Sequence, residues 1–178
     1  RQMCIRDRAK CVRTLRFTAP ILKVQFSPSS SRTLLVVLES REAFLVRFPS
    51  WEDVQSTTMS TEPRRIALHG TPDTSAACFT PDGLWILTGS VKGVIRLVNG
   101  QDGRLVHDLP CQIGASMIRE IVLDEQSRHV AVNMNDRTVR TLRVTYNDGC
   151  EMPTGLTPTH KFQDLVSRTP WSLSLIHI

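Results

Sequence analysis

Histidine and serine are residue types that often act in acid–base or nucleophilic chemistry, and this 178-residue chain contains both. Ser90 lies in the segment Gly89-Ser90-Val91-Lys92-Gly93, which differs from the G-x-S-x-G pattern of an activated serine nucleophile. We therefore interpret Ser90 as a hairpin-turn residue. The interior histidines have no triad or metal-ligand spacing, and we interpret them as core or surface residues. These histidines are His69, His107, His129 and His160.

The interior cysteines would bind a metal only if their spacing allowed it. Cys11, Cys78, Cys111 and Cys150 form no C-x-x-C pair and have no accompanying histidine cluster, so the sequence predicts no metal site. We interpret them as scattered buried thiols in a reducing compartment. No glycine-rich phosphate loop opens onto a helical segment, and we expect neither a cofactor nor a small-molecule substrate.

Cationic side chains in short polar segments offer a different chemistry, which is the binding of phosphate. Arg137 lies in Asn135-Asp136-Arg137, Arg168 lies in Ser167-Arg168-Thr169-Pro170, and Lys92 lies beside Gly93. An arginine can hold a phosphate through paired donors, whereas a lysine acts as a point charge. The alternative is that all three are solvated surface charges, which contribute about 0–1 kcal/mol to most interactions. The fold decides whether the three can act together.

Both ends of the chain carry sequence that we interpret as foreign to the protein. One codon choice for residues 1–8 is CGG CAG ATG TGT ATA AGA GAC AGR, and its reverse complement encodes Leu-Ser-Leu-Ile-His-Ile, the sequence of residues 173–178. Two ends of a natural protein have no physical reason to be translated complements, and this DNA resembles a transposon end used in sequencing libraries. We expect residues 1–8 and 173–178 to be non-native tails and residues 9–172 to be a partial domain.

The composition permits an acidic partner without demanding one. The formal charge is +5, and the first tail contributes three arginines and one aspartate, or +2, so that the remainder carries +3. No apolar run approaches the roughly 18 residues of a membrane helix, and no secretion signal is visible. We therefore expect no membrane partner.

Short apolar runs separated by turn residues predict an all-β fold. In ILKVQF (21–26) apolar and polar residues alternate, while TLLVVL (33–38) is apolar throughout, as expected of a strand buried on both faces. No segment keeps a helical apolar stripe over three turns. Further strands are predicted at 43–48, 64–68, 104–109 and 159–165.

These strands recur as a repeated unit. Three segments share the order strand, polar turn, strand, tight turn, strand, and their equivalent turn residues Ser27, Thr80 and Asp124 are 53 and 44 positions apart (27 to 80, 80 to 124). A period of about 40–50 residues with four strands indicates the blade of a WD40-type β-propeller. The WD dipeptide itself is replaced by Val98-Asn99, so these are degenerate WD repeats. We predict a fragment of about three blades.

Four stretches resemble the retinoblastoma-binding protein 5 family. They are RFTAPILKVQFSP (16–28), TGSVKGVIRLV (88–98), NDRTVRTLRV (135–144) and KFQDLVSRTPW (161–171), of which APILKVQ and QDLV-x-RTPW are the specific ones. The resemblance runs in the same order over nearly all of residues 14–171. It implies a roughly seven-bladed propeller that is a core subunit of COMPASS, the histone H3 lysine-4 methyltransferase assembly.

The alternation of loops in a blade predicts that the three cations share one face. If the strands of a blade are named A to D, the B–C turn and the D–A link exit at one rim, and the A–B and C–D turns at the other. Arg137 and Lys92 are B–C residues, and Arg168 is a D–A residue. The family resemblance implies a run of loop arginines on successive blades that contacts nucleosomal DNA, and Arg137 and Arg168 match two of them. Lys92 is added from geometry.

The sequence therefore predicts a non-catalytic chromatin scaffold in the nucleus. Its expected partners are other methyltransferase-complex subunits and nucleosomal DNA, bound through Arg137, Arg168 and Lys92, with catalysis in another chain. The alternative is a WD40 adaptor of another complex, such as a ubiquitin-ligase substrate receptor that binds a peptide in the central channel. A propeller hydrolase is a third interpretation, which would need Ser90 or a histidine to be active.

Overall fold

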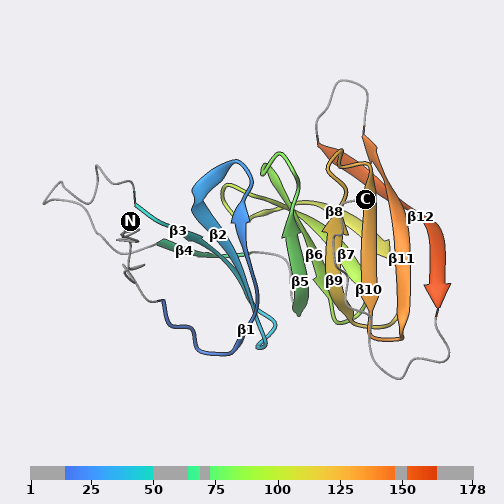
Figure 1. The fold of residues 1–178 in the computed structure, drawn as a ribbon, viewed down its shortest axis with the longest axis horizontal. Coiled ribbons are helices and arrows are strands. Elements are labelled where there is room, and N and C mark those ends of the chain that lie inside the picture. The colour runs from blue at the N-terminus through green and yellow to red at the C-terminus, as the bar shows by residue number, and fades with distance from the viewer. Residues whose placement is uncertain (1–14, 50–63, 69–72, 147–151, 164–178) are drawn as a thin grey trace, which may run out of the picture.

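The computed structural model of the chain describes residues 15–49, 64–68, 73–146 and 152–163, so both expected tails lie outside the described residues. Within these ranges the regular structure consists of strands (Figure 1). The strands are β1 (Ile21–Ser27), β2 (Ser30–Leu38), β3 (Ala43–Arg47), β4 (Arg64–Ala67), β5 (Thr74–Phe79), β6 (Trp85–Ser90), β7 (Val94–Asn99), β8 (Leu105–Gln112), β9 (Ile118–Leu123), β10 (His129–Met134), β11 (Thr138–Tyr146) and β12 (Pro153–Gln163).

The strands form three antiparallel four-stranded sheets, each made of consecutive strands. The sheet orders are β1-β2-β3-β4, β5-β6-β7-β8 and β9-β10-β11-β12. Each sheet is one blade with its strands A to D in chain order, which confirms the predicted all-β propeller architecture. No helix in the described ranges has the length and hydropathy needed to cross a bilayer.

The outermost strand of the third blade is longer than the sequence pattern indicated. The prediction placed it at 159–165, where polar Gln163 and Asp164 lie between apolar Phe162 and Leu165, but β12 begins at Pro153. Its bounds follow from its partner, because β12 pairs along the whole of β11, from Tyr146↔Pro153 to Thr138↔Gln163. The hydrogen-bond ladder, rather than an apolar pattern, decides where this exposed edge strand starts.

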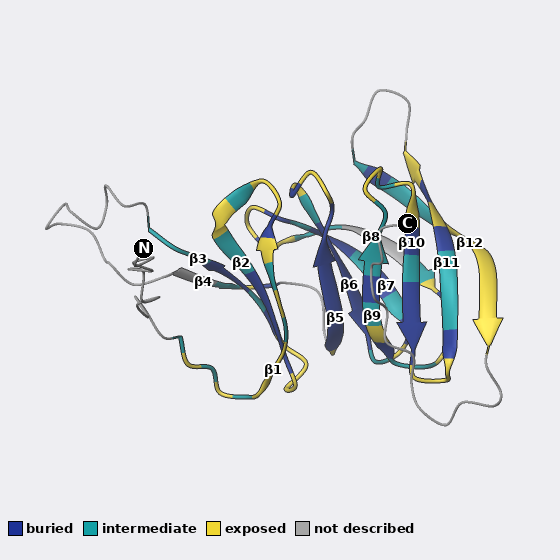
Figure 2. Cartoon of the chain, in the orientation of Figure 1, coloured by how far each residue is buried: buried dark blue, intermediate teal, exposed yellow. Residues whose placement is uncertain are grey.

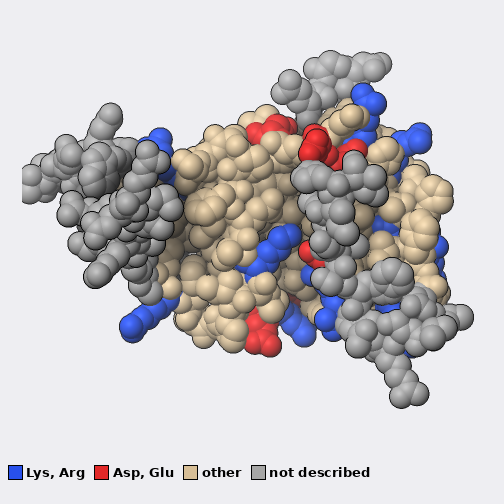
Figure 3. All heavy atoms as spheres, viewed as in Figure 1, with Lys and Arg blue, Asp and Glu red and all other residues tan. Residues whose placement is uncertain are grey.

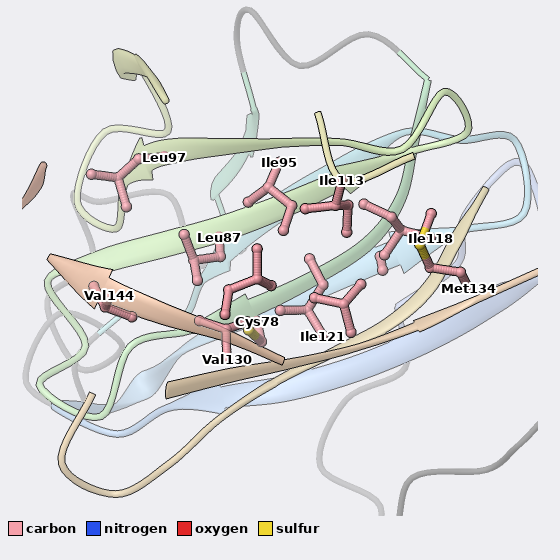
Figure 4. Close-up of a cluster of buried hydrophobic side chains, with 13 residues drawn as sticks. Cys78, Leu87, Ile95, Leu97, Ile113, Ile118, Ile121, Val130, Met134 and Val144 are labelled. Carbon is pink, nitrogen blue, oxygen red and sulfur yellow. The ribbon is translucent and has the colours of Figure 1, made fainter. Parts of the chain in front are cut away.

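The blades stand side by side and bury apolar side chains between their faces (Figure 1). Successive residues of a strand point to opposite faces, so Ile86 packs toward the first blade while Leu87 packs toward the third. The middle sheet is therefore covered on both faces, which is why β5 is buried along its length (Figure 2). The cluster between the second and third blades contains Leu97, Ile121 and Val144 (Figure 4).

The first blade leaves apolar side chains of β1 uncovered on its outer face. Leu22, Val24 and Phe26 are 57%, 55% and 59% exposed, although each belongs to a strand hydrogen-bonded to β2 (Figure 2). Leu15 and Phe17 cover another part of this face by packing against the cluster of Val36, Leu38 and Val46. Exposed apolar side chains grouped on one sheet face are typical of a surface that another element covers.

The Cys78 thiol lies within the cluster between the second and third blades, and its burial raises its pKa from 9.0 to about 12 (Figure 4). Because the thiolate is the reactive form, we expect Cys78 to react with iodoacetamide at pH 9 about 500-fold more slowly in the folded chain than in urea-unfolded chain. Mass spectrometry of the alkylated peptide measures both rates.

The same pKa shift predicts the direction of a pH effect on stability. Below pH 9 the thiol is neutral in both states and makes no difference, whereas between pH 9 and about 12 the unfolded chain ionises first. The contribution of Cys78 therefore lowers the free energy of unfolding as the pH rises through this range. Equal alkylation rates in folded and unfolded chain would contradict the buried placement of Cys78.

Candidate nucleic-acid interface

The β6–β7 turn and the β10–β11 turn lie on the same rim, joined by the link between the second and third blades. This link follows β8, and the Ile113 N–H donates to the Gly93 carbonyl at 3.0 Å. At its other end the Met117 carbonyl accepts the Asn135 N–H at 2.8 Å. The structure thus brings Lys92 and Arg137 to one rim, as the loop alternation predicted. Figure 3 shows basic side chains along the lower edge of the view, with acidic groups among them.

The third residue of each B–C turn has a left-handed backbone. These residues are Arg41, Gly93 and Arg137, with φ of 68°, 74° and 63°. Glycine adopts this conformation without penalty, whereas another L-residue loses about 1–2 kcal/mol there. Arg137 therefore occupies a position that favours glycine, and its backbone conformation is held by the rest of the turn.

Side-chain bonds on both sides hold the Arg137 turn. The Asp136 carboxylate accepts the Thr138 N–H at 3.1 Å and the Thr138 hydroxyl at 2.5 Å. Arg140 lies on the next strand with its guanidinium 3.6 Å from the same carboxylate, so this acid is neutralised by a neighbour. Arg137 itself is exposed. The turn presents a cation from a fixed backbone, as binding loops on rigid scaffolds do.

Arg119 is a further cation at this turn, and no sequence motif marks it. It lies near the start of β9, is exposed, and its Nε donates to the Asn135 side-chain oxygen at 2.8 Å. In the sequence Arg119 follows Ile118 and looks like any polar residue of an alternating strand. Arg119 reaches Asn135 because the link pairs with the β10–β11 turn. The two residues are 16 positions apart, so no local sequence pattern marks the contact.

Lys92 shares the rim but not the turn position of Arg137. It precedes the left-handed Gly93, so its structural counterpart in the third blade is Asp136 rather than Arg137. Ser90 shapes this turn because its Oγ accepts the N–H groups of Lys92 and Val94 at 3.3 and 3.1 Å. Ser90 is buried, and these bonds agree with its interpretation as a turn residue.

Arg168 lies outside the described residues. The last described residue before it is Gln163, which pairs with Thr138 beside the Arg137 turn. The chain therefore leaves the third blade at the rim where Lys92 and Arg137 lie. A place for the Arg168 guanidinium remains a prediction.

The first blade adds Arg41 to the same rim. Its turn is tied to the start of β1, because the Glu39 N–H donates to the Pro20 carbonyl at 2.9 Å. Arg41 and Arg119 both line a hollow of about 720 Å³ that opens between β1, β5 and β9. Lys23 and the carboxylates of Glu39 and Glu120 also line this hollow, so its charge is mixed.

The described histidines do not form a catalytic group with Ser90. His129 lies 3.4 Å from the Asp124 carboxylate at the turn before β10, on the opposite rim. The His160 ring stacks on Phe162 on the exposed part of β12. His69 and the side chain of His107 lie outside the described residues, as do Cys11 and Cys150. In the described ranges no cluster of histidine, cysteine or acidic residues is placed to hold a metal.

Comparison with solved structures gives a match over most of the chain. The β-propeller domain of Cps50 (Swd1) from Myceliophthora thermophila superposes with a TM-score of 0.72 and is 25% identical, covering 89% of this chain and 50% of that domain. The same family is found among curated proteins. The COMPASS component Swd1 of Saccharomyces cerevisiae is 23% identical in an alignment 175 residues long that covers 94% of this chain. No protein-family model matches the chain.

The relatives of this chain include Swd1 and retinoblastoma-binding protein 5 proteins. The Drosophila melanogaster retinoblastoma-binding protein 5 homolog is 29% identical over 164 residues, and the Set1 complex component Swd1 of Schizosaccharomyces pombe is 29% identical over 99 residues. The chain spans 40%, 30% and 23% of the length of the budding-yeast, fly and fission-yeast proteins. The resemblance seen in the sequence is confirmed.

Proposed function

We propose that this chain is part of a non-catalytic scaffold subunit of a histone H3 lysine-4 methyltransferase complex and acts in the nucleus. The observation that carries the proposal is the similarity to a COMPASS component over 94% of the chain, together with the match to a Swd1 propeller. A rigid propeller that displays loops suits a protein that positions other chains.

Affinity purification of the full-length protein from its host tests this role. We expect co-purification of a methyltransferase and of histone H3 lysine-4 methylation activity that resides in that partner. Recovery of ubiquitin-ligase subunits in its place would favour the adaptor alternative. Hydrolase activity lost on Ser90→Ala would favour an enzyme.

We also propose that the three described sheets are blades of a larger closed ring. The exposed apolar face of β1 supports this, because a further blade packed there would cover Leu22, Val24 and Phe26 as the first blade covers β5. Ring closure hides unpaired edges and faces that otherwise pair with other chains.

Within that ring, we propose that the rim of Lys92, Arg137 and Arg168 docks the subunit on nucleosomal DNA. The supporting observations are the common rim of Lys92 and Arg137 and the left-handed backbone of exposed Arg137. Contacts of this kind bind the phosphate backbone, do not depend on base sequence and weaken as salt rises.

Replacing Arg137 and Arg168 together by alanine in the full-length protein is expected to weaken nucleosome binding. Each lost phosphate contact releases one counterion fewer, so the slope of log K against log salt should become shallower by about 0.9 for each residue, or about 1.8 for both. Fluorescence anisotropy of a labelled nucleosome, titrated at several salt concentrations, measures the slope.

The matched control is the pair Arg104→Ala and Arg128→Ala. Both residues are exposed, and they lie in the β7–β8 and β9–β10 turns on the opposite rim. Because each double variant replaces two arginines by alanine, the change in net charge is the same. We expect the control to leave the slope within error of the parent protein. Equal slopes for both double variants would rule out the DNA-docking role of this rim.

A further inference from the structure

Arg119 has the geometry of a phosphate ligand whose orientation is already fixed. Its Nε is engaged by the Asn135 side-chain oxygen at 2.8 Å, which is the hydrogen bond it makes within the described part of the chain. When Nε is engaged, the two terminal amino groups of the guanidinium remain side by side on the edge that points away from Asn135. Two parallel N–H donors are the arrangement that binds two oxygens of one phosphate.

The charge around Asn135 favours an anion. Arg119, Arg137 and Arg140 lie on or beside the turn, Asp136 pairs with Arg140, and Glu120 follows Arg119, so three positive charges minus two negative leave +1. Arg140 is partly withdrawn because it pairs with Asp136 and is less exposed than Arg137. Arg119 and Arg137 are thus the exposed cations, and they flank the same turn.

The comparable cation on the first blade is less suited to bind phosphate. Arg41 has the same left-handed backbone as Arg137, but Glu39 and Glu42 lie within two residues of it, and Glu42 is held in place by the Ser40 hydroxyl at 2.9 Å. That turn carries one cation and two carboxylates, a net charge of −1. The charge pattern therefore selects Arg119 over Arg41.

We infer that Arg119 is a further DNA-contacting residue, which binds a backbone phosphate next to the one bound by Arg137. The inference rests on the proposed docking of this rim on DNA and extends it from the Arg137 turn to the start of β9, at the edge of the hollow of mixed charge that Arg119 lines. Arg119 binds through its terminal amino groups, while its Nε and Asn135 set the plane of the guanidinium.

The test is nucleosome binding by the full-length protein with Arg119→Gln. We expect a loss of affinity on the order of tenfold at moderate salt and a salt slope that is shallower by about 0.9, the value for one phosphate. Arg119→Lys keeps the charge without the paired donors, so it should retain most of the slope and recover part of the affinity. Arg128→Gln on the opposite rim is the charge-matched control and should change neither quantity.

Asn135→Ala separates a direct contact from an effect on the turn. This variant removes the same hydrogen bond but leaves the Arg119 cation, so the salt slope should stay close to that of the parent protein. If Asn135→Ala flattens the slope as much as Arg119→Gln does, Arg119 acts by holding the turn, and the inference is overturned.

The Arg137 variants distinguish this inference from the proposed function. A flattened slope with Arg137→Ala and an unchanged slope with Arg119→Gln would overturn the role of Arg119 and leave the docking rim standing. Unchanged salt slopes for Arg137→Ala and Arg119→Gln would overturn both the docking rim and the role of Arg119. Circular dichroism of each variant checks that a change in binding does not come from unfolding.

Discussion

Replacing Gly93 by alanine is expected to lower the free energy of unfolding by roughly 2–4 kcal/mol. Gly93 combines a φ of 74° with a close approach of the link between blades, since an added Cβ would lie 2.4 Å from the Gly114 carbonyl oxygen. The clash is with main chain, which cannot rotate away as a side chain can. The variant must therefore lose the left-handed turn, the contact with the link, or both. Chemical denaturation followed by circular dichroism measures the effect.

Gly103→Ala is the matched control for this prediction. Gly103 has a similar φ of 71°, but the nearest atom to an added Cβ, the Ala67 carbonyl oxygen, is 3.1 Å away, so the substitution carries the backbone penalty with a milder clash than at Gly93. We expect it to lower the free energy of unfolding by about 1 kcal/mol. The difference between the two variants isolates the packing of the link against the β6–β7 turn. Equal effects would mean that this packing contributes little.

Phe26→Ala is expected to have its large effect only in a closed ring. In the described structure the Phe26 side chain is 59% exposed, so its removal would lower the free energy of unfolding by less than about 1 kcal/mol. If a further blade packs on this face in the full-length protein, Phe26 becomes a core residue, and its truncation should lower the free energy of unfolding by about 3–5 kcal/mol. Denaturant titration of the full-length variant distinguishes these values.

Leu97→Ala provides the reference for a core truncation. Leu97 is 0% exposed between the second and third blades, and its replacement should lower the free energy of unfolding by about 2–5 kcal/mol. A Phe26→Ala effect close to that of Leu97→Ala supports a covering blade. A small Phe26→Ala effect beside a large Leu97→Ala effect would show that the β1 face stays open to solvent, and the proposed ring would then be wrong.

Alternation and turn residues made the blades predictable, because both are local properties of the sequence. Leu22, Val24 and Phe26 alternate with Lys23 and Gln25, and β1 lies where that pattern placed it. β12 begins earlier than its sequence predicts, because Pro153, Gly155 and Pro158 disfavour a strand and only the pairing with β11 places its start there. A strand whose limits are set by its neighbour cannot be delimited from its own residues.

At the candidate site, too, residues in local turn motifs were predictable, whereas a contact between distant segments was not. Arg137 and Lys92 were found because each lies in a short turn with a characteristic sequence. Arg119 was missed because its contact with Asn135 depends on how the link after β8 pairs with a later turn. The offset between Lys92 and Arg137 was also invisible in the sequence, since it follows from which residue of each turn takes the left-handed backbone.

The main-chain bonds at both ends of the link after β8 have a consequence for the shape of the rim. Gly93 and Asn135 are fastened to the same short link by backbone groups, so the separation between the two turns is set by peptide geometry and not by side-chain rotamers. The cationic turns of this rim are therefore held at a constant spacing. A double helix, with evenly pitched phosphates, would fit it better than a flexible single strand, whose charges have no constant spacing.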